Sequence, residues 1–504
     1  MKATMKRLLC MLLAALCLVG SAGAEWPMED SYNWYEVFVY AYQDSNGDGI
    51  GDLPGLMSRL DYIADMGYTG LWLMPVMPSP SYHKYDVADY MSVDPQYGTV
   101  EDFKALVQAC HERGIRIIID LPVNHTSTQH PWFTAACDAL RRGDTEDPYV
   151  GYYNFDHNDG TKRIQVAGTD WYYEEQFEGG GMPDLALDNP AVLAEIRSIM
   201  TFWLQECDVD GFRLDAVTSY FAGDVDRNVQ VLDQLKAMAE ELKPGSYLVG
   251  EAWVGLNSIA AYYQSQVDSF FLFPMSQAEG YIVRALRSRG KPASTFVDCL
   301  QQVDAAIPAD RVLAPFLSNH DTGRTIPALQ ARTNPAKAKF AEGVMNMLRG
   351  NVFTYYGEEI GMVGSGDDPN KRLPMYWNDD DMTDLAPGVT KVEYAYPSAD
   401  AQLADETSLL HYCRRVNHIR LAEPAIARGE NAYVHVDDWT CVMSRTLGEE
   451  TVYIAMNFSA SKEQTIALTV DGLTIAHDLE TDAGAATLQG MTLTLPPYAI
   501  VILK

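Results

Sequence analysis

The sequence predicts an α/β protein built on a (β/α)8 barrel, with a small domain inserted after strand three and an antiparallel β-sandwich at the C-terminus. Three observations indicate this class. Short β-rich runs alternate with segments of helical periodicity, as parallel strands joined by helices do. One interval between these runs is too long for a loop. After the last helical segment, short strands follow one another with only turn residues between them.

The barrel strands are predicted from short apolar runs, which suit a parallel sheet buried on both faces. They are EVFVY (36–40), GLWLM (70–74), IRIIID (115–120), GFRLD (211–215), YLVGE (247–251), SFFLF (269–273), VLAPFL (312–317) and NVFTYY (351–356). Helical periodicity is clearest in LPGLMSRLDYIADMG (53–67), VEDFKALVQACHERG (100–114), AVLAEIRSIMTFWLQEC (191–207) and NVQVLDQLKAMAEELKPG (228–245). Several of these end in glycine, as helices often do.

The exception lies between strands three and four. From His125 to Met182 the chain is rich in Gly, Asp, Tyr and Trp and has no sustained helical period. We interpret residues 125–182 as an inserted domain, which leaves 25–124 and 183–424 for the barrel. Residues 425–504 form the predicted sandwich, with strands in AYVHV (432–436), CVMSR (441–445), TVYIAMNF (451–458), QTIALTV (464–470) and MTLTLPPYAIVIL (491–503).

Residues 1–24 have the pattern of a secretory signal peptide. Lys2, Lys6 and Arg7 precede the apolar run LLCMLLAALCLVG, and small residues around Ala24 provide a cleavage site. We therefore expect a secreted protein, extracellular or periplasmic, whose mature chain begins near Glu25.

The charge balance narrows the classes of partner. Removing the three basic residues of the signal from a total of 37, against 69 acidic residues, leaves a formal charge of −35. Such a surface repels nucleic acid and anionic membranes and suits a neutral ligand. No later stretch is apolar for long enough to span a bilayer.

Six cysteines remain after removal of the signal, without CxxC spacing, which argues against a zinc site. We expect a monomer.

Carboxylates follow four of the predicted strands. Strand three ends in DLPVNH, strand four in FRLD, strand five in GEAW and strand seven in LSNHD. The C-terminal ends of barrel strands meet at one rim, where barrel enzymes keep their active sites. Taken alone, each of these acids is equally consistent with a helix cap or an exposed surface charge. Together, Asp120, Asp215, Glu251 and Asp321 predict a catalytic rim.

The stretch DSNGDGIGD predicts a calcium site. Asp44, Asn46, Asp48 and Asp52, with the carbonyl of Ile50, offer oxygen ligands at the spacing that opens a calcium-sensor loop. A sensor loop would need glutamate at its twelfth position, which here is Gly55. We therefore expect a structural calcium rather than a sensor. A polar turn without metal is the alternative.

The four strand endings, DLPVNH, GFRLDAV, GEAW and SNHD, resemble the signature regions of the α-amylase family of glycoside hydrolases, family thirteen. The resemblance covers essentially the whole mature chain. MPDL (182–185) resembles the fifth region of members intermediate between oligo-1,6-glucosidases and neopullulanases, and DSNGDGIGD resembles the calcium loop of oligo-1,6-glucosidase-type members.

The resemblance implies roles for individual residues. Asp215 is expected to be the nucleophile, Glu251 the general acid/base and Asp321 the carboxylate that stabilises the transition state. A retaining glycosidase needs one ionised and one protonated carboxyl group. Arg213, on the same strand face as Asp215, should orient it. The expected substrate contacts are Tyr85, Asp86, His125, Arg213, His320 and Arg324, with Arg372 as a weaker candidate.

Two features bear on specificity. Thr218 and Ser219 stand where many α-amylases have Lys-His, whereas Ala216 is the small residue found in α-1,4-acting members. We expect an α-amylase acting on starch and maltooligosaccharides. The alternatives are an exo-acting α-glucosidase or oligo-1,6-glucosidase, a transglycosylase, and an inactive carbohydrate-binding protein of the same fold.

Overall fold

The structure is a computed structural model that describes residues 33–288 and 290–504. The predicted signal peptide at 1–24 therefore lies outside the described residues. The main sheet has eight parallel strands in the order β10-β9-β8-β7-β3-β2-β1-β11. A parallel bridge between Phe316 and Phe353 joins its two edges. The sheet thus forms a near-closed barrel, as the sequence predicted.

The observed strands follow the predicted runs closely, except for the first. They are β1 Asn33–Val37, β2 Gly70–Leu73, β3 Arg116–Leu121, β7 Gly211–Leu214, β8 Tyr247–Gly250, β9 Ser269–Phe271, β10 Val312–Ala314 and β11 Val352–Tyr355. Every residue of β1, β2, β3, β7, β8, β9 and β11 is buried. This burial explains why these strands read as apolar runs rather than as alternating ones.

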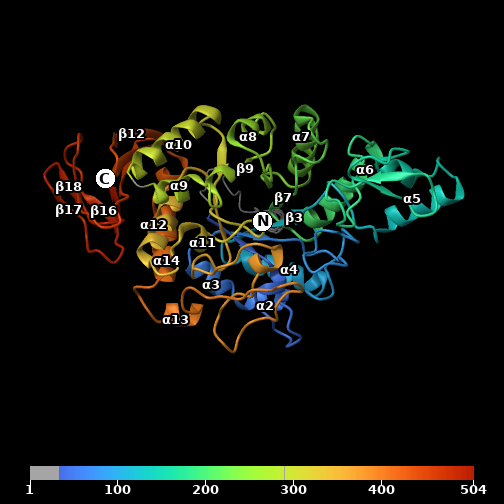
Figure 1. The fold of residues 1–504 in the computed structure, drawn as a ribbon, viewed down its shortest axis with the longest axis horizontal. Helices are drawn as coiled ribbons and strands as arrows, with labels where there is room; N and C mark the ends of the chain where they lie inside the picture. Colours follow the sequence, from blue (N-terminus) through green and yellow to red (C-terminus); the bar gives the residue numbers. More distant parts are fainter. Residues whose placement is uncertain (1–32, 289) are drawn as a thin grey trace, which may run out of the picture. The chain divides into compact units, whose positions relative to one another are not determined.

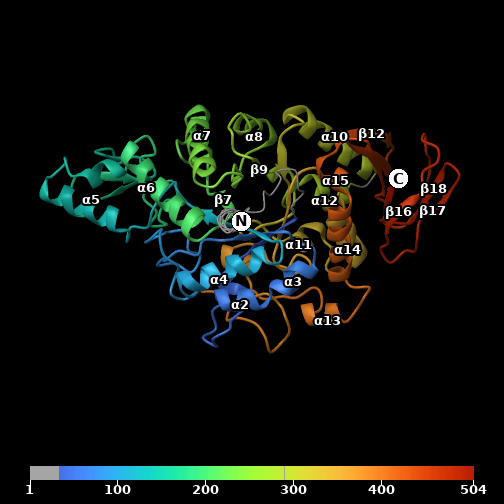
Figure 2. The ribbon, with the colours of Figure 1, turned by 180° about the vertical axis from the view of Figure 1, so that it is seen from behind.

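Helices cover the outside of the barrel (Figures 1 and 2). They are α2 Leu53–Ser58, α3 Leu60–Asp65, α4 Val100–His111, α6 Pro190–Thr201, α7 Val225–Leu242, α8 Leu256–Tyr262, α9 Tyr281–Arg287, α10 Pro292–Ala306, α11 Thr325–Leu329, α12 Pro335–Asn346, α13 Ala399–Leu403, α14 Leu409–Ala422 and α15 Pro424–Arg428. Short 3-10 turns lie at Val39–Ala41, Pro148–Tyr152, Phe273–Met275 and Asp368–Lys371, and a π-helical turn, Phe202–Glu206, extends α6.

Two predicted elements differ from the structure near the N-terminus. The first strand was predicted at 36–40 but leaves the sheet after Val37, because the loop that follows folds back and the amide of Gly51 donates to the carbonyl of Tyr40 (2.8 Å). The helix predicted over 53–67 is two helices, α2 and α3. It breaks at Arg59, whose guanidinium pairs with Asp381 and lies over the ring of Trp377.

The inserted segment contains a helix that the sequence reading missed. Helix α5, Pro131–Arg142, begins with proline in its first turn and ends at Gly143 in the left-handed conformation. Its apolar face packs Phe133 against Tyr153 and Tyr173. A small antiparallel sheet completes the segment, with strands β4 Phe155–Asp156, β5 Arg163–Gln165 and β6 Tyr172–Glu174 in the order β4-β6-β5.

The C-terminal segment is two antiparallel sheets around an apolar core, which confirms the predicted sandwich. One sheet has the order β12-β13-β14-β19-β16 and the other β15-β18-β17. The strands are β12 Glu430–Val436, β13 Thr440–Leu447, β14 Glu450–Asn457, β15 Gln464–Ala467, β16 Ile475–Leu479, β17 Thr487–Gln489, β18 Thr492–Leu495 and β19 Ile500–Leu503. Strands β16 and β17 were not predicted. Buried Val442 and Val501 of the first sheet cluster with Ile466 and Leu493 of the second.

The sandwich is packed against barrel helices. Tyr433 Oη and Asn431 Nδ2 donate to the carboxylate of Asp304 in α10, at 2.7 and 2.9 Å. The ring of Phe458 lies 5.3 Å from that of Phe296 in α10 and 4.9 Å from that of Phe340 in α12. These contacts join the sandwich directly to the barrel.

The described cysteines are free thiols, and all are buried: Cys110, Cys137, Cys207, Cys299, Cys413 and Cys441. None of the helices in the described part of the chain is both long and apolar enough to cross a membrane.

Three buried glutamates lie close enough to interact: Glu342 in α12, and Glu358 and Glu359 in the turn after β11. Glu359 accepts from Tyr35 Oη (2.7 Å) and Tyr62 Oη (2.8 Å), and Glu358 accepts from Thr325 Oγ1 (3.0 Å). Burial raises the pKa of Glu342 in α12 well above its usual range, and the charges of Glu358 and Glu359 add to the increase. The folded state therefore favours the protonated form of Glu342.

This cluster predicts a pH-dependent stability. Because the folded pKa of Glu342 lies above its unfolded value, its contribution to stability is present at acidic pH and is lost as the pH rises past about 4.5. Glu342→Gln should remove that loss and stabilise the fold at pH 8 by about 1–3 kcal/mol, with little effect at pH 4.5. Thermal melting at both pH values measures this, with exposed Glu449→Gln as control. Equal melting temperatures for the two variants at pH 8 would contradict it.

Candidate active site

The predicted acids lie at one end of the barrel, as the strand order requires. Asp120 is part of β3, Asp215 directly follows β7, and Glu251 directly follows β8. Asp321 comes from the loop after β10. The C-terminal ends of parallel strands face one rim. Acids from four separate strands therefore converge.

Arg213, fully buried in β7, joins three of these acids. Its Nη1 donates to Asp120 Oδ1 (2.6 Å) and to Asp215 Oδ1 (2.5 Å), and its Nη2 pairs with Glu251 Oε2 (2.9 Å). Residues two apart on a strand point to the same face, which places Arg213 beneath Asp215 as predicted. One guanidinium thus neutralises part of the charge of three carboxyl groups and fixes their directions.

Glu251 is the acid best suited to hold a proton. Burial raises the pKa of Glu251 to about 7, and the charges of Asp215 and Asp321 contribute to the increase, whereas Arg213 opposes it. The backbone N–H of Ala216 donates to Glu251 Oε2 (3.1 Å). Ala216 takes up a left-handed conformation (φ 45°), which is uncommon outside glycine and is often found at functional sites.

Asp321 is held in the opposite charge state. Burial alone would raise the pKa of Asp321, but the charge and hydrogen bond of His320, together with the charge of Arg372, lower it well below its usual range. His320 Nε2 lies 3.0 Å from Asp321 Oδ2, and Arg372 Nη2 donates to Asp321 Oδ1 (2.7 Å). An ionised Asp321 and a protonated Glu251 therefore coexist at pH values below about 7.

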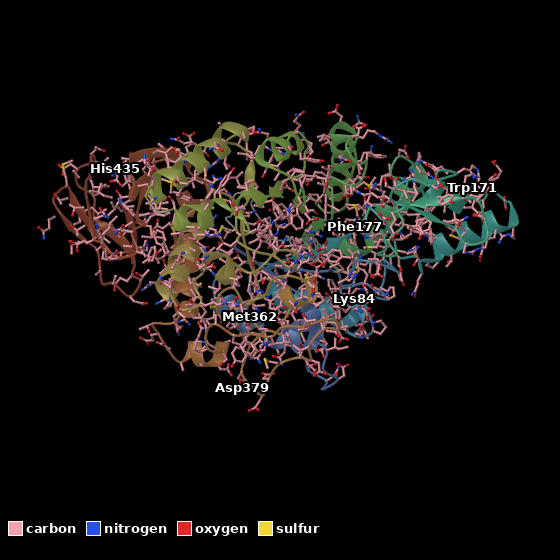
Figure 3. The ribbon with its side chains drawn as sticks, viewed as in Figure 1. Lys84, Trp171, Phe177, Met362, Asp379 and His435 are labelled. Atoms are coloured by element: carbon pink, nitrogen blue, oxygen red, sulfur yellow. The ribbon has the colours of Figure 1, made fainter. Side chains whose placement is uncertain are left out.

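A cavity of about 430 Å³ opens over these acids. It is lined by His83, Tyr85, His125, Phe177, Met182, Asp215, Ala216, Thr218, Ser219, Glu251, Trp253, Asp321, Asp368, Lys371 and Arg372. Its walls combine aromatic side chains with charged and hydroxyl groups, a mixture that suits a polar ligand with apolar faces. Figure 3 shows Phe177 on the barrel side of the inserted segment and Trp171 farther out.

Two predicted contact residues are aimed at this cavity. His125 is buried, and its Nε2 has no hydrogen-bond partner among the described residues. Burial lowers the pKa of His125, so its ring is neutral and free to bond a ligand hydroxyl. Tyr85 stacks on the ring of His320 (5.4 Å), and its hydroxyl donates to Asp120 Oδ2 (3.0 Å).

The four other predicted contacts are not among the described residues that line the cavity: Asp86, Arg213, His320 and Arg324. Asp86 accepts hydrogen bonds from Ser79 Oγ (2.6 Å) and Ser81 Oγ, so it holds its own loop. Arg324 is buried, donates to the carbonyl of Tyr356, and lies 4.0 Å over the ring of Tyr355. Direct substrate contact by these residues stays a prediction from the resemblance.

Several other lining residues stand outside the main set of expected contacts. Arg372, only a weaker candidate, lines the cavity and binds Asp321. Lys371 Nζ donates to the carbonyl of Asp321 (2.7 Å) and to Asp368 Oδ1 (2.8 Å). Trp253 is 48% exposed and stacks on Phe273 (4.8 Å). The segment 368–372 has no periodicity that could reveal its direction, but Trp253, two residues after Glu251, was visible as an aromatic residue at the rim.

The predicted calcium ligands are engaged by the protein itself. Asp44 accepts from the amides of Asn46, Gly47 and Gly49 at 2.7–2.9 Å. Asp52 accepts from Ser45 and from Gly55, where it caps α2. No group of three or more Asp, Glu, His or Cys side chains is placed to hold a metal ion in residues 33–288 and 290–504. Calcium therefore stays a prediction from the sequence.

Known proteins share this fold. The family described as alpha amylase, catalytic domain, matches residues 36–429. Alpha-amylase 3 of Dictyoglomus thermophilum is 34% identical over 84% of both chains, and a cyclomaltodextrinase of Geobacillus thermopakistaniensis is 30% identical over 90% of this chain and 70% of its own. The solved structure of Eubacterium rectale Amy13B superposes with a TM-score of 0.89 at 40% identity, covering 95% of this chain and 96% of that one.

The calcium prediction is tested by removing metal. A calcium ion bound only by the folded state adds stability by mass action. EDTA should therefore lower the melting temperature, millimolar calcium should restore it, and Asp48→Ala should abolish the difference. Overlapping melting curves with and without EDTA would show that the loop is held by its own hydrogen bonds and binds no stabilising calcium.

Proposed function

Because the chain belongs to the α-amylase family of glycoside hydrolases, we propose that it is a retaining α-amylase that cleaves α-1,4-glucosidic bonds in starch and maltooligosaccharides. The observation that carries the proposal is the set of carboxyl groups around Arg213. Glu251 has a pKa raised to about 7, while Asp215 lies 2.5 Å from the guanidinium and both line the cavity. Retaining hydrolysis needs this combination of acid and nucleophile.

The reaction follows from these positions. Glu251 donates its proton to the glycosidic oxygen while Asp215 attacks the anomeric carbon to form a glycosyl-enzyme. Glu251, now ionised, takes a proton from the water that releases the sugar, so the α-configuration is retained. Ionised Asp321 stabilises the positive charge of the transition state. His125 Nε2 offers a hydrogen bond to a sugar hydroxyl.

Three features favour α-1,4 hydrolysis over the alternatives. Ala216 is the small residue that the family resemblance associates with α-1,4 bonds. A relative named α-amylase is 34% identical over 84% of the chain. The alternative of an inactive binding protein is not supported, because all three acids line the cavity.

Exo action or transglycosylation is the second candidate function. It is favoured by Phe177 and Met182 of the inserted segment, which line part of the cavity.

We also propose that the enzyme is exported. The support is the basic and apolar pattern of residues 1–24 together with the strongly acidic composition of the rest of the chain. The substrate fits this assignment, because a neutral glucan is not repelled by the acidic surface.

The function is tested by a product time course on soluble starch and on an end-blocked maltoheptaoside, with anomers followed by NMR. We expect fragments of mixed length, α-anomers in the first minutes and cleavage of the blocked substrate. Asp215→Asn should lower the rate by about a thousandfold or more, whereas exposed Asp188→Asn should not. Glucose or maltose alone, with the blocked substrate intact, would indicate the exo-acting alternative.

The pH dependence tests the role of Glu251. A general acid must be protonated, so kcat/KM should fall as the pH rises through about 7, the value to which the pKa of Glu251 is raised. Glu251→Gln, assayed on a 4-nitrophenyl maltoside whose leaving group needs little protonation, should lose this alkaline limb. A limb unchanged in that variant would assign it to another group, such as Asp120, whose pKa burial also raises to about 7.

A further inference from the structure

Glu36 is a buried carboxylate in β1 with no role in the mechanism above. It is 1% exposed, and the residues on either side of it in the strand, Tyr35 and Val37, are fully buried. Its Oε1 lies 2.5 Å from Nδ1 of His320, which is 284 residues later in the chain. The same oxygen lies 3.4 Å from the backbone N of His320. A buried charge in a barrel strand is costly unless it is paired, and His320 is its partner.

The other ring nitrogen of His320 faces the reacting groups. Nε2 lies 2.6 Å from the hydroxyl of Tyr85 and 3.0 Å from Asp321 Oδ2. Tyr85 stacks on the imidazole, and the Trp72 ring meets its edge at 5.8 Å. His320 is thus held in one orientation between Glu36 on one side and the rim on the other.

This placement fixes the charge of the ring. A neutral imidazole donates from one nitrogen only, whereas both nitrogens of His320 face a carboxylate and must donate. Burial alone would lower the pKa of His320, but the charges of Asp321 and Glu36 raise it to about 10. The remaining charged or titratable neighbours are Asp120 of β3, Glu251 after β8, Tyr85, and Arg372, whose Nε donates to the carbonyl of His320 (3.1 Å).

We propose that Glu36 is a positioning residue for catalysis: its carboxylate keeps the second proton on His320, so that Nε2–H of His320 always points at Asp321 and Tyr85. The same proton also orients the Tyr85 hydroxyl. Because this hydroxyl accepts from Nε2–H of His320, its own proton is directed to Asp120 Oδ2 (3.0 Å). Glu36 therefore fixes which atom donates each hydrogen bond from His320 to Tyr85 and from Tyr85 to Asp120, which binds Arg213. The kinetic consequence rests on the proposed function, whereas the charge of His320 does not.

Glu36→Gln separates this role from simple packing. Glutamine has the same shape but no charge, so His320 should lose its second proton about 2–3 pH units lower than in the native enzyme. Imidazole NMR of protein labelled with 15N-histidine measures this directly, with His320 assigned by comparison with His320→Gln. The native spectrum should show His320 doubly protonated from pH 6 to 8.5, and the variant should show it titrating within that range.

Kinetics provide the second readout. Asp321 acts on the transition state, so Glu36→Gln should lower kcat about tenfold to a hundredfold, with KM within about threefold of the native value. Glu36→Asp, which keeps the charge on a shorter side chain, should recover part of kcat. The matched control is Glu359→Gln, a buried glutamate that accepts from Tyr35 and Tyr62 and lies outside the cavity lining. It should leave both kcat and the His320 signal unchanged.

The proposal is overturned if His320 stays doubly protonated to pH 8.5 in Glu36→Gln, or if kcat of that variant equals that of Glu359→Gln. If Glu36→Gln does not fold, the native protein decides: a His320 ring that loses its second proton below pH 8.5 would overturn the proposal. If the protein cleaves no α-glucan, the proposed function fails, but the NMR titration still decides whether Glu36 sets the charge of His320.

Discussion

The buried guanidinium of Arg213 is the interaction on which the rest of the active site depends. It is fully buried in β7 and lies within 3 Å of carboxylate oxygens of Asp120, Asp215 and Glu251. Three carboxyl groups so close together would repel one another and take up protons without a cation among them. The barrel supplies the geometry, because β3, β7 and β8 are adjacent in the sheet and deliver their acids to one point.

A second buried cation, His320, completes the charge pattern. It lies between Glu36 and Asp321, while Arg372 binds the other oxygen of Asp321. Two cations thus hold Asp321 ionised. Glu251 contacts Arg213, which also binds Asp120 and Asp215, and the pKa of Glu251 is raised to about 7. The division between a proton donor and ionised partners follows from which cation each acid contacts, as general acid catalysis near neutral pH requires.

The sequence predicted the barrel, the sandwich and the catalytic acids because each leaves a local signal: an apolar run, an alternating strand or an acid at a strand end. It did not predict Glu36, because a single polar residue within an apolar strand gives no sign of a partner 284 residues away. For Asp86 and Arg324 the resemblance indicates the loop but not the direction of the side chain. That direction depends on neighbours such as Ser79 and Tyr355. Helix α5 was missed because its capping residues were outweighed by the aromatic, glycine-rich composition around it.

The central claim is a pattern of protons: Glu251 is protonated, Asp321 is ionised, and His320 carries two protons. Neutron diffraction from a crystal exchanged into deuterated buffer near pH 6 observes these positions directly. We expect deuterium on the carboxyl group of Glu251 and on both Nδ1 and Nε2 of His320, and none on Asp321. Deuterium on Asp321, or a His320 ring with a single deuterium, would contradict this pattern.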